Sequence, residues 1–421
     1  MSLNKFFHCQ LTLAKFKNCG YLKPYLDPFA DWLTKQQFTK SCSRNHIRNI
    51  VHFSYFLQKA GQVDLCDLTR HMDAFVLEHI PQCTCKEWKH VRACKAVSYS
   101  LNRFKKFMTA CLGVNFNAED FAYSKIHNDF LSWLSKIHHL DDATIALRSQ
   151  YLKKFLRWYK ETFRSQGLRK LAPRDVEIFL IENTKDYGKA YKRSLQAALR
   201  GFFNFCYEQG YTPRNLRFSV PTIRTYRLSK APRAIKENEA LKLLASIDRS
   251  THSGKRNYAI LILLYTYGVR GGQLRALKLD DIDWHNEQIN FPALKGGKSC
   301  SFPLTVEAGN SLLDYLRNVR KKTDYREVFL TIRAPFVSMT NHGALSQMVR
   351  SSILKAQVMS PNLGSHCFRH AFVSRMLKQD EPFKHIADML GHKHIQTTFI
   401  YTKIDFSSLA EVALELPEVK K

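Results

Sequence analysis

Apolar residues recur every three to four positions through most of the first 210 residues, with few glycines and little strand-like alternation. This pattern predicts helices. Short segments also recur in the same order: "DPFADWL" (27–33) is similar to "NDFLSWL" (128–134), and "LNRFKKF" (101–107) is similar to "LRGFFNF" (199–205). We therefore expect two copies of one four- or five-helix unit, although unrelated amphipathic helices of similar length also resemble one another.

The pattern changes after residue 236. "ENEALKLLASID" predicts a short amphipathic helix, and "YAILILLYTYG", which is apolar on all sides, predicts a buried helix that ends at Gly268. "QINFP" and "CSFPL" are strand-like, and the glycines of the intervening "KGGK" allow a tight hairpin turn. The expected fold class is mainly α, with tandem helical domains followed by a C-terminal domain that holds a small antiparallel β-sheet.

A basic stretch separates these two patterns. "RNLRFSVPTIRTYRLSKAPRAIK" contains no acidic residue, and Pro221 and Pro232 disfavour a continuous helix. We interpret it as a linker that lies along a DNA backbone. The predicted domains are an additional N-terminal helical domain at 1–115, a second helical domain at 120–213, the linker at 214–236, and a C-terminal domain at 237–421.

The charge of the chain indicates a polyanionic partner. It has 65 Lys and Arg against 36 Asp and Glu, a formal net charge of +29, and this excess favours double-stranded DNA. A ribosomal protein would share the charge, but it would rarely carry 29 Phe and 18 Tyr on amphipathic helices. The candidate DNA contacts are Arg214, Arg217, Arg224, Arg227, Lys230, Arg233, Lys236, Lys189, Lys192, Arg193, Arg200 and Lys298.

The longest apolar run, residues 258–268, is too short to span a membrane, and polar residues interrupt the N-terminal apolar stretch. We expect a cytoplasmic, nucleoid-associated protein with no membrane contact. The 11 cysteines are scattered, which favours reduced thiols over a disulfide framework.

One cysteine cluster offers possible zinc ligands. "HIPQCTCKEWKHVRAC" contains His79, Cys83, Cys85, His90 and Cys94. Zinc is conceivable, but Cys-x-Cys is not the usual finger spacing and no second pair follows. The expectation is therefore buried or surface thiols, with no metal.

The last domain carries polar residues that a core does not need. In chain order they are Arg270, Lys295, His366, Arg369, His392 and Tyr401. His366 and Arg369 are three residues apart and therefore share a helix face. Gly391 and the Thr397–Thr398 pair offer a break that could bring His392 and Tyr401 into one site.

This set suits attack on a phosphodiester. Two arginines can grip the non-bridging oxygens of one phosphate and stabilise the extra charge of the transition state. A phenol can attack phosphorus, a histidine can take its proton, and a lysine can protonate the departing 5′-oxygen. No carboxylate cluster of metal-binding spacing accompanies these residues, so we expect chemistry without a metal or any other cofactor.

The motifs resemble those of the tyrosine recombinases, the phage-integrase family. "GVRGGQLRALKLDDID" is similar to the first arginine box, "LKGGKSCSFPL" to the hairpin lysine box, "HCFRHAFVSRML" to the His-x-x-Arg-His box, and "MLGHKHIQTTFIYTKI" to the Leu-Gly-His box with its nucleophile. Each box alone is a weak pattern, whereas four in order are specific. The resemblance is close over residues 233–405, and it implies that 237–421 form the catalytic domain with a C-terminal tail helix. It is looser over the preceding helical unit at 120–213, which it implies to be a SAM-like domain that binds core DNA.

The resemblance implies roles for these residues. Arg270 and Arg369 would clamp the phosphate, and Lys295 would be the general acid, with Lys298 as the alternative. His366 would accept a proton and His392 would donate a hydrogen bond to the phosphate. Tyr401 would form the 3′-phosphotyrosyl bond. The family exchanges strands through a Holliday junction inside a homotetramer, so a tetramer on DNA is expected, with a possible accessory DNA-bending or directionality factor.

The sequence departs from the family at two places. Gly272 and Gln273 replace the usual Ser-Glu, which predicts a weaker helix cap, and Ser299, Cys300 and Ser301 replace the common arginine of the hairpin. We expect integration, excision or transposition of a mobile element. The alternatives are a Xer-like resolvase, a type IB topoisomerase-like enzyme, and a non-catalytic DNA-binding descendant. The acidic amphipathic tail after Tyr401 could cover its own domain or dock on a neighbouring protomer.

Overall fold

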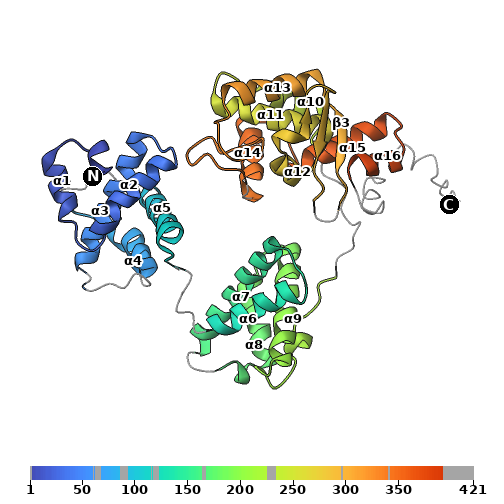
Figure 1. Ribbon diagram of the computed structural model, residues 1–421. Coiled ribbons are helices and arrows are strands. Elements are labelled where there is room, and N and C mark those ends of the chain that lie inside the picture. Colours follow the sequence, from blue (N-terminus) through green and yellow to red (C-terminus); the bar gives the residue numbers. More distant parts are fainter. Residues whose placement is uncertain are drawn as a thin grey trace, which may run out of the picture. The chain divides into compact units, whose positions relative to one another are not determined.

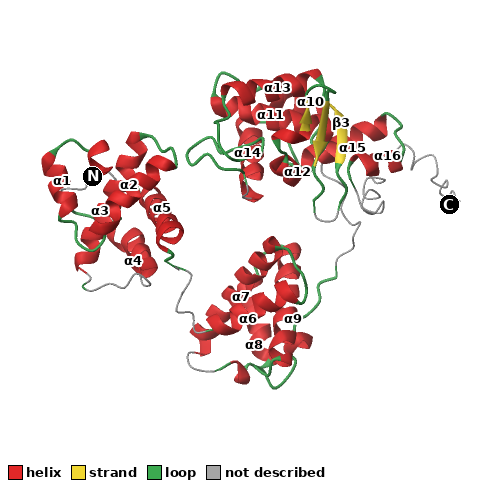
Figure 2. Cartoon of the chain, viewed as in Figure 1, coloured by secondary structure: helices red, strands yellow, loops and turns green. Residues whose placement is uncertain are grey.

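The computed structural model describes residues 2–59, 61, 68–85, 93–114, 116, 123–163, 167–224, 234–294, 297–339 and 342–391. The described elements fall into three consecutive stretches of the chain, coloured blue, green and yellow to red in Figure 1. Helices dominate all three, and among the described residues strands occur only in the last (Figure 2). The predicted fold class, mainly helical with a small antiparallel sheet, is confirmed.

The first stretch is helical, as its apolar period predicts. Its elements are η1 (Ser2–Lys5), α1 (Gln10–Lys17), α2 (Lys23–Lys35), α3 (Lys40–Lys59), α4 (Leu68–Ala74), the π-helical turn η3 (Phe75–His79) and α5 (Cys94–Leu112). Helix α2 buries Leu26, Phe29 and Leu33, which are spaced along one face. Gly113 ends α5 with φ 66°, a left-handed conformation that glycine adopts without strain.

The second stretch packs around one aromatic core. It contains α6 (Ser124–Lys136), α7 (Asp142–Phe163), η5 (Leu168–Lys170), α8 (Pro173–Thr184), α9 (Lys189–Glu208) and η6 (Leu216–Ser219). Phe130, Phe155 and Phe202 are fully buried at its centre. Leu216 and Val220 are buried in the same core. The first part of the predicted linker therefore packs with these helices instead of running free.

The two helical stretches place similar aromatic pairs on similar helices. The rings of Phe29 and Trp32 on α2 are stacked with centroids 6.0 Å apart, and those of Phe130 and Trp133 on α6 are stacked at 5.9 Å. Helices α2 to α5 then match α6 to α9 in order. This agreement supports the proposed internal repeat, because unrelated amphipathic helices would not need to repeat both the order and the ring pairs.

The third stretch holds the sheet. Its elements are α10 (Glu237–Ala245), α11 (His252–Tyr267), α12 (Gly271–Ala276), η7 (Leu279–Asp281), β1 (Ile282–Asp283), β2 (Gln288–Phe291), β3 (Cys300–Pro303), α13 (Val306–Asn318), α14 (His342–Lys355), α15 (His366–Lys378) and α16 (Phe383–Met389). The strands are antiparallel in the order β1-β2-β3. Ile289 and Phe291 face the core and alternate with exposed residues.

The hairpin between β2 and β3 keeps both predicted strands. Its described ladder ends at the pair of Phe291 and Cys300. Beyond that pair, the Gly297 N–H donates to the Leu294 carbonyl at 3.0 Å, which is the spacing of a β-turn bond. Lys295 and Gly296, the centre of the tight turn predicted at "KGGK", lie outside the described residues, so the turn itself stays a prediction.

Helix α11 is the buried centre of this stretch, as predicted. Residues 258–264 are all buried, and Gly268 ends the helix with φ 57°. A Cβ at Gly268 would lie 2.5 Å from Cγ of Phe372, so the position needs glycine for both conformation and space. The close contact sets α15 against the end of α11.

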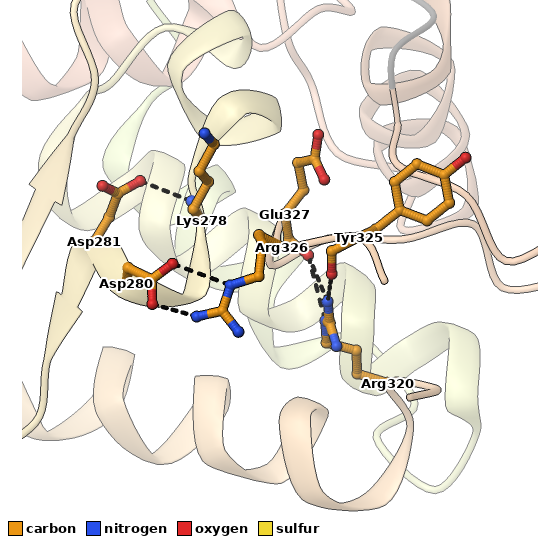
Figure 3. Close-up of polar contacts among 7 residues, drawn as sticks. All are labelled: Lys278, Asp280, Asp281, Arg320, Tyr325, Arg326 and Glu327. Atoms are coloured by element: carbon orange, nitrogen blue, oxygen red, sulfur yellow. Dashed lines mark hydrogen bonds and ion pairs between the residues drawn. The ribbon is translucent and has the colours of Figure 1, made fainter. Parts of the chain in front are cut away.

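A polar network fastens the loop before α14 to the start of the sheet (Figure 3). Arg326 forms an ion pair with Asp280, and the Lys278 backbone N–H donates to the Asp281 carboxylate at 2.7 Å. Arg320 donates to the carbonyls of Tyr325, at 2.6 Å, and Glu327, at 2.9 Å. These contacts satisfy loop carbonyls that lack partners in a helix or strand.

No helix in the described part of the chain is long and apolar enough to cross a membrane. None of the ten cysteines in the described part of the chain forms a disulfide, and Cys66 lies outside the described residues.

Candidate active site

The two predicted catalytic arginines, Arg270 and Arg369, donate to the same backbone carbonyl. Arg270 donates from Nη1 to the Leu390 carbonyl at 3.3 Å, and Arg369 donates from Nη2 to the same oxygen at 2.8 Å. Arg369 also donates from Nη1 to the Gly268 carbonyl at 3.1 Å. Because both guanidiniums reach one oxygen atom, they are close enough together to bind one phosphate group.

Arg270 is positioned by the turn between α11 and α12. It is the N-cap of α12, and its backbone N–H donates to Oε1 of Gln273 at 3.1 Å. Gln273 is only 1% exposed, and its Nε2 donates to the Pro292 carbonyl at 3.2 Å. The neutral amide of Gln273 thus makes the cap bond where the family has Glu, and it also ties Arg270 to the end of β2.

Gln273→Ala is expected to destabilise the fold by roughly 1–3 kcal/mol, because it leaves the buried Arg270 N–H and the Pro292 carbonyl without this partner. Gln273→Glu should recover part of the loss, since a carboxylate still accepts from the N–H but cannot donate to the carbonyl. Urea denaturation checks both. Gln288→Ala, which removes a glutamine bonded to Ser301 on the exposed side of β2, is the matched control and should change stability little. Equal losses for Gln273→Ala and Gln288→Ala would contradict the role given to Gln273.

The predicted His-x-x-Arg-His box lies on the first turn of α15. His366 begins the helix, and Arg369 is 4% exposed one turn later. The pKa of His366 is lowered by partial desolvation and by the positive charges of Arg369 and Arg270. A neutral imidazole beside two guanidiniums can accept a proton, which is the role expected for His366.

His370, the last residue of the box, is half-buried behind His366. Desolvation, with the charges of His366 and Arg369, lowers the pKa of His370 to about 4. This places its titration below that of an ordinary histidine.

The shift of His370 predicts acid sensitivity. Its pKa is lower in the folded than in the unfolded state, so the unfolded chain binds more protons. The part of the stability that depends on neutral His370 should be fully present above about pH 6.5 and be lost progressively as the pH drops towards 4. In melting experiments between about pH 7 and pH 5, His370→Asn should reduce the fall relative to wild type. The exposed His285→Asn serves as the control. An unchanged pH profile in His370→Asn would contradict the assignment.

The hairpin reaches the arginine pair from another side. The backbone N–H of Lys298 donates to the Gly391 carbonyl at 3.4 Å. A Cβ on Gly297 would lie 3.8 Å from Nη1 of Arg270, so the turn passes directly beside that guanidinium. Lys295 itself lies outside the described residues, two positions before Gly297. Lys298, its alternative, is exposed.

Gly391 closes the group. It has φ 61°, and a Cβ there would lie 2.6 Å from the Lys298 carbonyl oxygen. His392 follows it directly, but His392 and Tyr401 both lie outside the described residues. The structure therefore brings together Arg270, His366 and Arg369. Gly297 and Gly391, which lie beside them, adjoin the undescribed segments that contain Lys295 and His392.

Sequence reasoning missed three contributors to this group. They are the amide of Gln273, the carbonyl of Leu390 and the buried thiol of Cys300. Burial raises the pKa of the Cys300 thiol, and the Gln273 hydrogen bond and the charges of Arg369 and Arg270 oppose this shift. Gly391 gave the one usable signal, because a glycine before a candidate catalytic histidine indicates a constrained backbone. The other contributors act through backbone atoms or a neutral side chain and leave no charge pattern.

The predicted DNA contacts are mostly exposed. Arg214, Arg217, Arg224, Lys236, Lys189 and Arg193 are exposed, and Lys192 and Arg200 are half-buried. Arg200 donates to the Pro221 carbonyl at 3.0 Å and to Thr222 at 3.3 Å, so it holds the chain that follows η6. Arg227, Lys230 and Arg233 lie outside the described residues.

Known proteins share these features. Residues 233–408 match the model of the phage integrase family. The chain is 29% identical over 403 residues to the protein named integrase/recombinase y4rA of Sinorhizobium fredii, covering 94% of this chain and 95% of that protein. It is 37% identical over 188 residues to integrase/recombinase y4gC of the same organism, covering 44% of this chain and 96% of that protein.

A solved structure shows the same fold. It is the XerH site-specific recombinase bound to a palindromic difH substrate, in a post-cleavage complex. The match covers 81% of this chain and 93% of the XerH chain, with a TM-score of 0.52 and 18% sequence identity. The resemblance expected from the four motifs is therefore confirmed. The chain belongs to the phage integrase family and is a tyrosine site-specific recombinase.

Proposed function

We propose that this recombinase cuts and rejoins double-stranded DNA through a 3′-phosphotyrosyl bond at Tyr401. The observation that carries the proposal is the convergence of Arg270 and Arg369 on the Leu390 carbonyl, two residues before His392. A phosphate held by the same donors would meet two forked guanidiniums, whose interaction with it strengthens as negative charge builds up during attack.

The remaining roles follow from the chemistry of each group. Tyr401 attacks the phosphorus, and His366, whose pKa is lowered, accepts its proton. Lys295, or Lys298 in its place, protonates the departing 5′-oxygen, and His392 donates a hydrogen bond to the phosphate. Phosphate neutralisation by arginine makes this scheme independent of a metal or other cofactor.

The partner is DNA, and the assembly is a homotetramer that passes through a Holliday junction. The net charge of +29 and the exposed basic residues on α9 and after η6 support DNA contact. The proposed biological role is integration, excision or transposition of a mobile element, in the cytoplasm and at the nucleoid. The long similarity to y4rA supports the role of an integrase.

A Xer-like resolvase is the second candidate. The observation that favours it is the fold shared with XerH, whose solved complex contains difH DNA. Both functions use the same cleavage chemistry and differ in the DNA site. Sequencing the DNA ends joined to the protein distinguishes them, since an element boundary indicates integration and a single chromosomal site indicates resolution.

The test of the chemistry is to locate the protein–DNA bond. The full chain is incubated with nicked duplexes made from the DNA that flanks its gene, which trap the cleaved state. After nuclease digestion, mass spectrometry should find a nucleotide on Tyr401. An adduct on any other residue, or none on any tested duplex, would contradict the proposal. Relaxation of supercoils by the monomer would instead indicate a topoisomerase.

A further inference from the structure

Two histidines and two cysteines come together in the N-terminal stretch, and none of them belongs to the recombinase motifs in the sequence. They are His52, His79, Cys83 and Cys85, and their four ligand atoms all lie within 4.8 Å of one another. No step of DNA cleavage uses them. A group of two imidazoles and two thiols this close is the donor set of a metal site.

Local structure brings these residues to one place. His52 is on α3 and is 4% exposed. His79 ends the π-helical turn η3, where the Ile80 N–H donates to the Phe75 carbonyl at 2.9 Å and the His79 ring stacks on the Phe75 ring at 5.2 Å. A π-turn inserts a residue into a helix and re-aims its side chains, a feature often found at functional sites.

The chain turns sharply after η3. The Cys83 N–H donates to the Ile80 carbonyl at 3.4 Å, and the Gln82 N–H donates to the His79 carbonyl at 3.2 Å. These bonds hold residues 79–83 in consecutive turns, so that Cys83 and Cys85 lie beside the imidazole of His79. All four residues of the group are buried or half-buried.

We propose that His52, His79, Cys83 and Cys85 bind one zinc ion that has a structural role. Zinc bonds of about 2.3 Å to sulfur and 2.0–2.1 Å to nitrogen separate tetrahedral ligand atoms by roughly 3.3–3.8 Å. The observed limit of 4.8 Å is close enough for side-chain rotations to reach this geometry. Four protein ligands leave no open position, which distinguishes a structural site from a catalytic one. Two thiolates also balance the charge of the ion.

The second helical stretch offers a comparison. There Lys154 on α7 donates from Nζ to the Asn183 carbonyl at 2.9 Å and so ties α7 to the end of α8. The zinc ligands would tie α3 to the end of η3 in a similar way.

This site differs from the one that the sequence suggested and disfavoured. The cluster of residues 79–94 has a Cys-x-Cys spacing that is unusual for a finger, and its possible ligands included His90 and Cys94. In the structure the fourth ligand comes from α3, upstream of the cluster. A lone histidine on a helix gives no sign in the sequence that it faces such a cluster.

The experiment measures metal in the full chain purified without chelators. Mass spectrometry of metals should find about one zinc per chain, and the Cys83→Ser/Cys85→Ser variant should lose it. Cys94→Ser is the matched control, since Cys94 lies in the same sequence cluster but outside the group, and it should keep the zinc. Cobalt substitution of the wild type should give the visible bands of tetrahedral coordination and a thiolate charge-transfer band.

A second measurement uses only the wild-type chain, so it tests the zinc site even if the double variant does not fold. Alkylation of the native wild-type chain, with and without a chelator, is mapped by peptide mass spectrometry, and chelation should expose Cys83 and Cys85 specifically. Wild-type protein without zinc and without a cobalt spectrum would overturn the proposal. So would zinc that survives loss of both cysteines, or chelation that leaves the reactivity of Cys83 and Cys85 unchanged.

Discussion

Tyr401→Phe is expected to form no covalent complex with nicked substrate DNA, a loss of at least about a thousand-fold in cleavage. The substitution removes one oxygen atom, the atom that would attack phosphorus. DNA affinity should stay near that of the wild type, because the many basic residues of the chain dominate binding. A denaturing gel that separates free from protein-linked DNA measures the cleavage, and a mobility-shift assay measures the binding.

A control tyrosine makes this result specific. Tyr325 is 42% exposed and contributes its backbone carbonyl to the network of Figure 3. Tyr325→Phe leaves that carbonyl in place and should cleave as the wild type does. Covalent complex at wild-type yield from Tyr401→Phe would exclude Tyr401 as the nucleophile.

Arg369→Ala should lose cleavage by about a hundred-fold or more while DNA affinity changes little. The affected interaction strengthens in the transition state, and the remaining basic surface keeps the DNA bound. Single-turnover cleavage and equilibrium binding, measured on the same duplex, test the two parts separately. An equal loss of both would contradict a role in the transition state.

The buried position of Arg369 requires a control for folding. Arg369→Lys keeps the charge but removes the fork that reaches the carbonyls of Gly268 and Leu390, so it should also cleave poorly. Arg320→Ala removes an arginine that likewise donates to backbone carbonyls, but in the loop before α14. It should lower the melting temperature without lowering cleavage by the folded protein. If Arg320→Ala and Arg369→Ala were equally inactive at equal stability, the assignment of Arg369 would fail.

The sequence predicted those parts of the fold that depend on local pattern. The uninterrupted apolar run of α11 and its end at Gly268 were predictable, because a helix that is apolar on every side must be buried. The strands β2 and β3 were predictable from their alternation. The pair at which their described ladder ends, Phe291 and Cys300, left no signal in the sequence.

The candidate site was predictable only as a set of side chains. Motif spacing identified Arg270, His366 and Arg369, which the structure brings together. It could not show that both arginines donate to the Leu390 carbonyl, because a backbone acceptor leaves no trace in residue types. The second bond of Gln273, to the Pro292 carbonyl, left no sign in the sequence for a related reason. A neutral amide that accepts from one backbone group and donates to another satisfies both, and only the three-dimensional arrangement shows the second partner.

The shared carbonyl of Leu390 also fixes one end of a tether. Ten peptide units separate Gly391 from Tyr401, and a fully extended chain of that length spans at most about 33–36 Å. Under the proposed function, attack by the Tyr401 phenol would therefore be nearly intramolecular, with a high local concentration. Adding or removing residues between His392 and Tyr401 would then change the rate of strand cleavage.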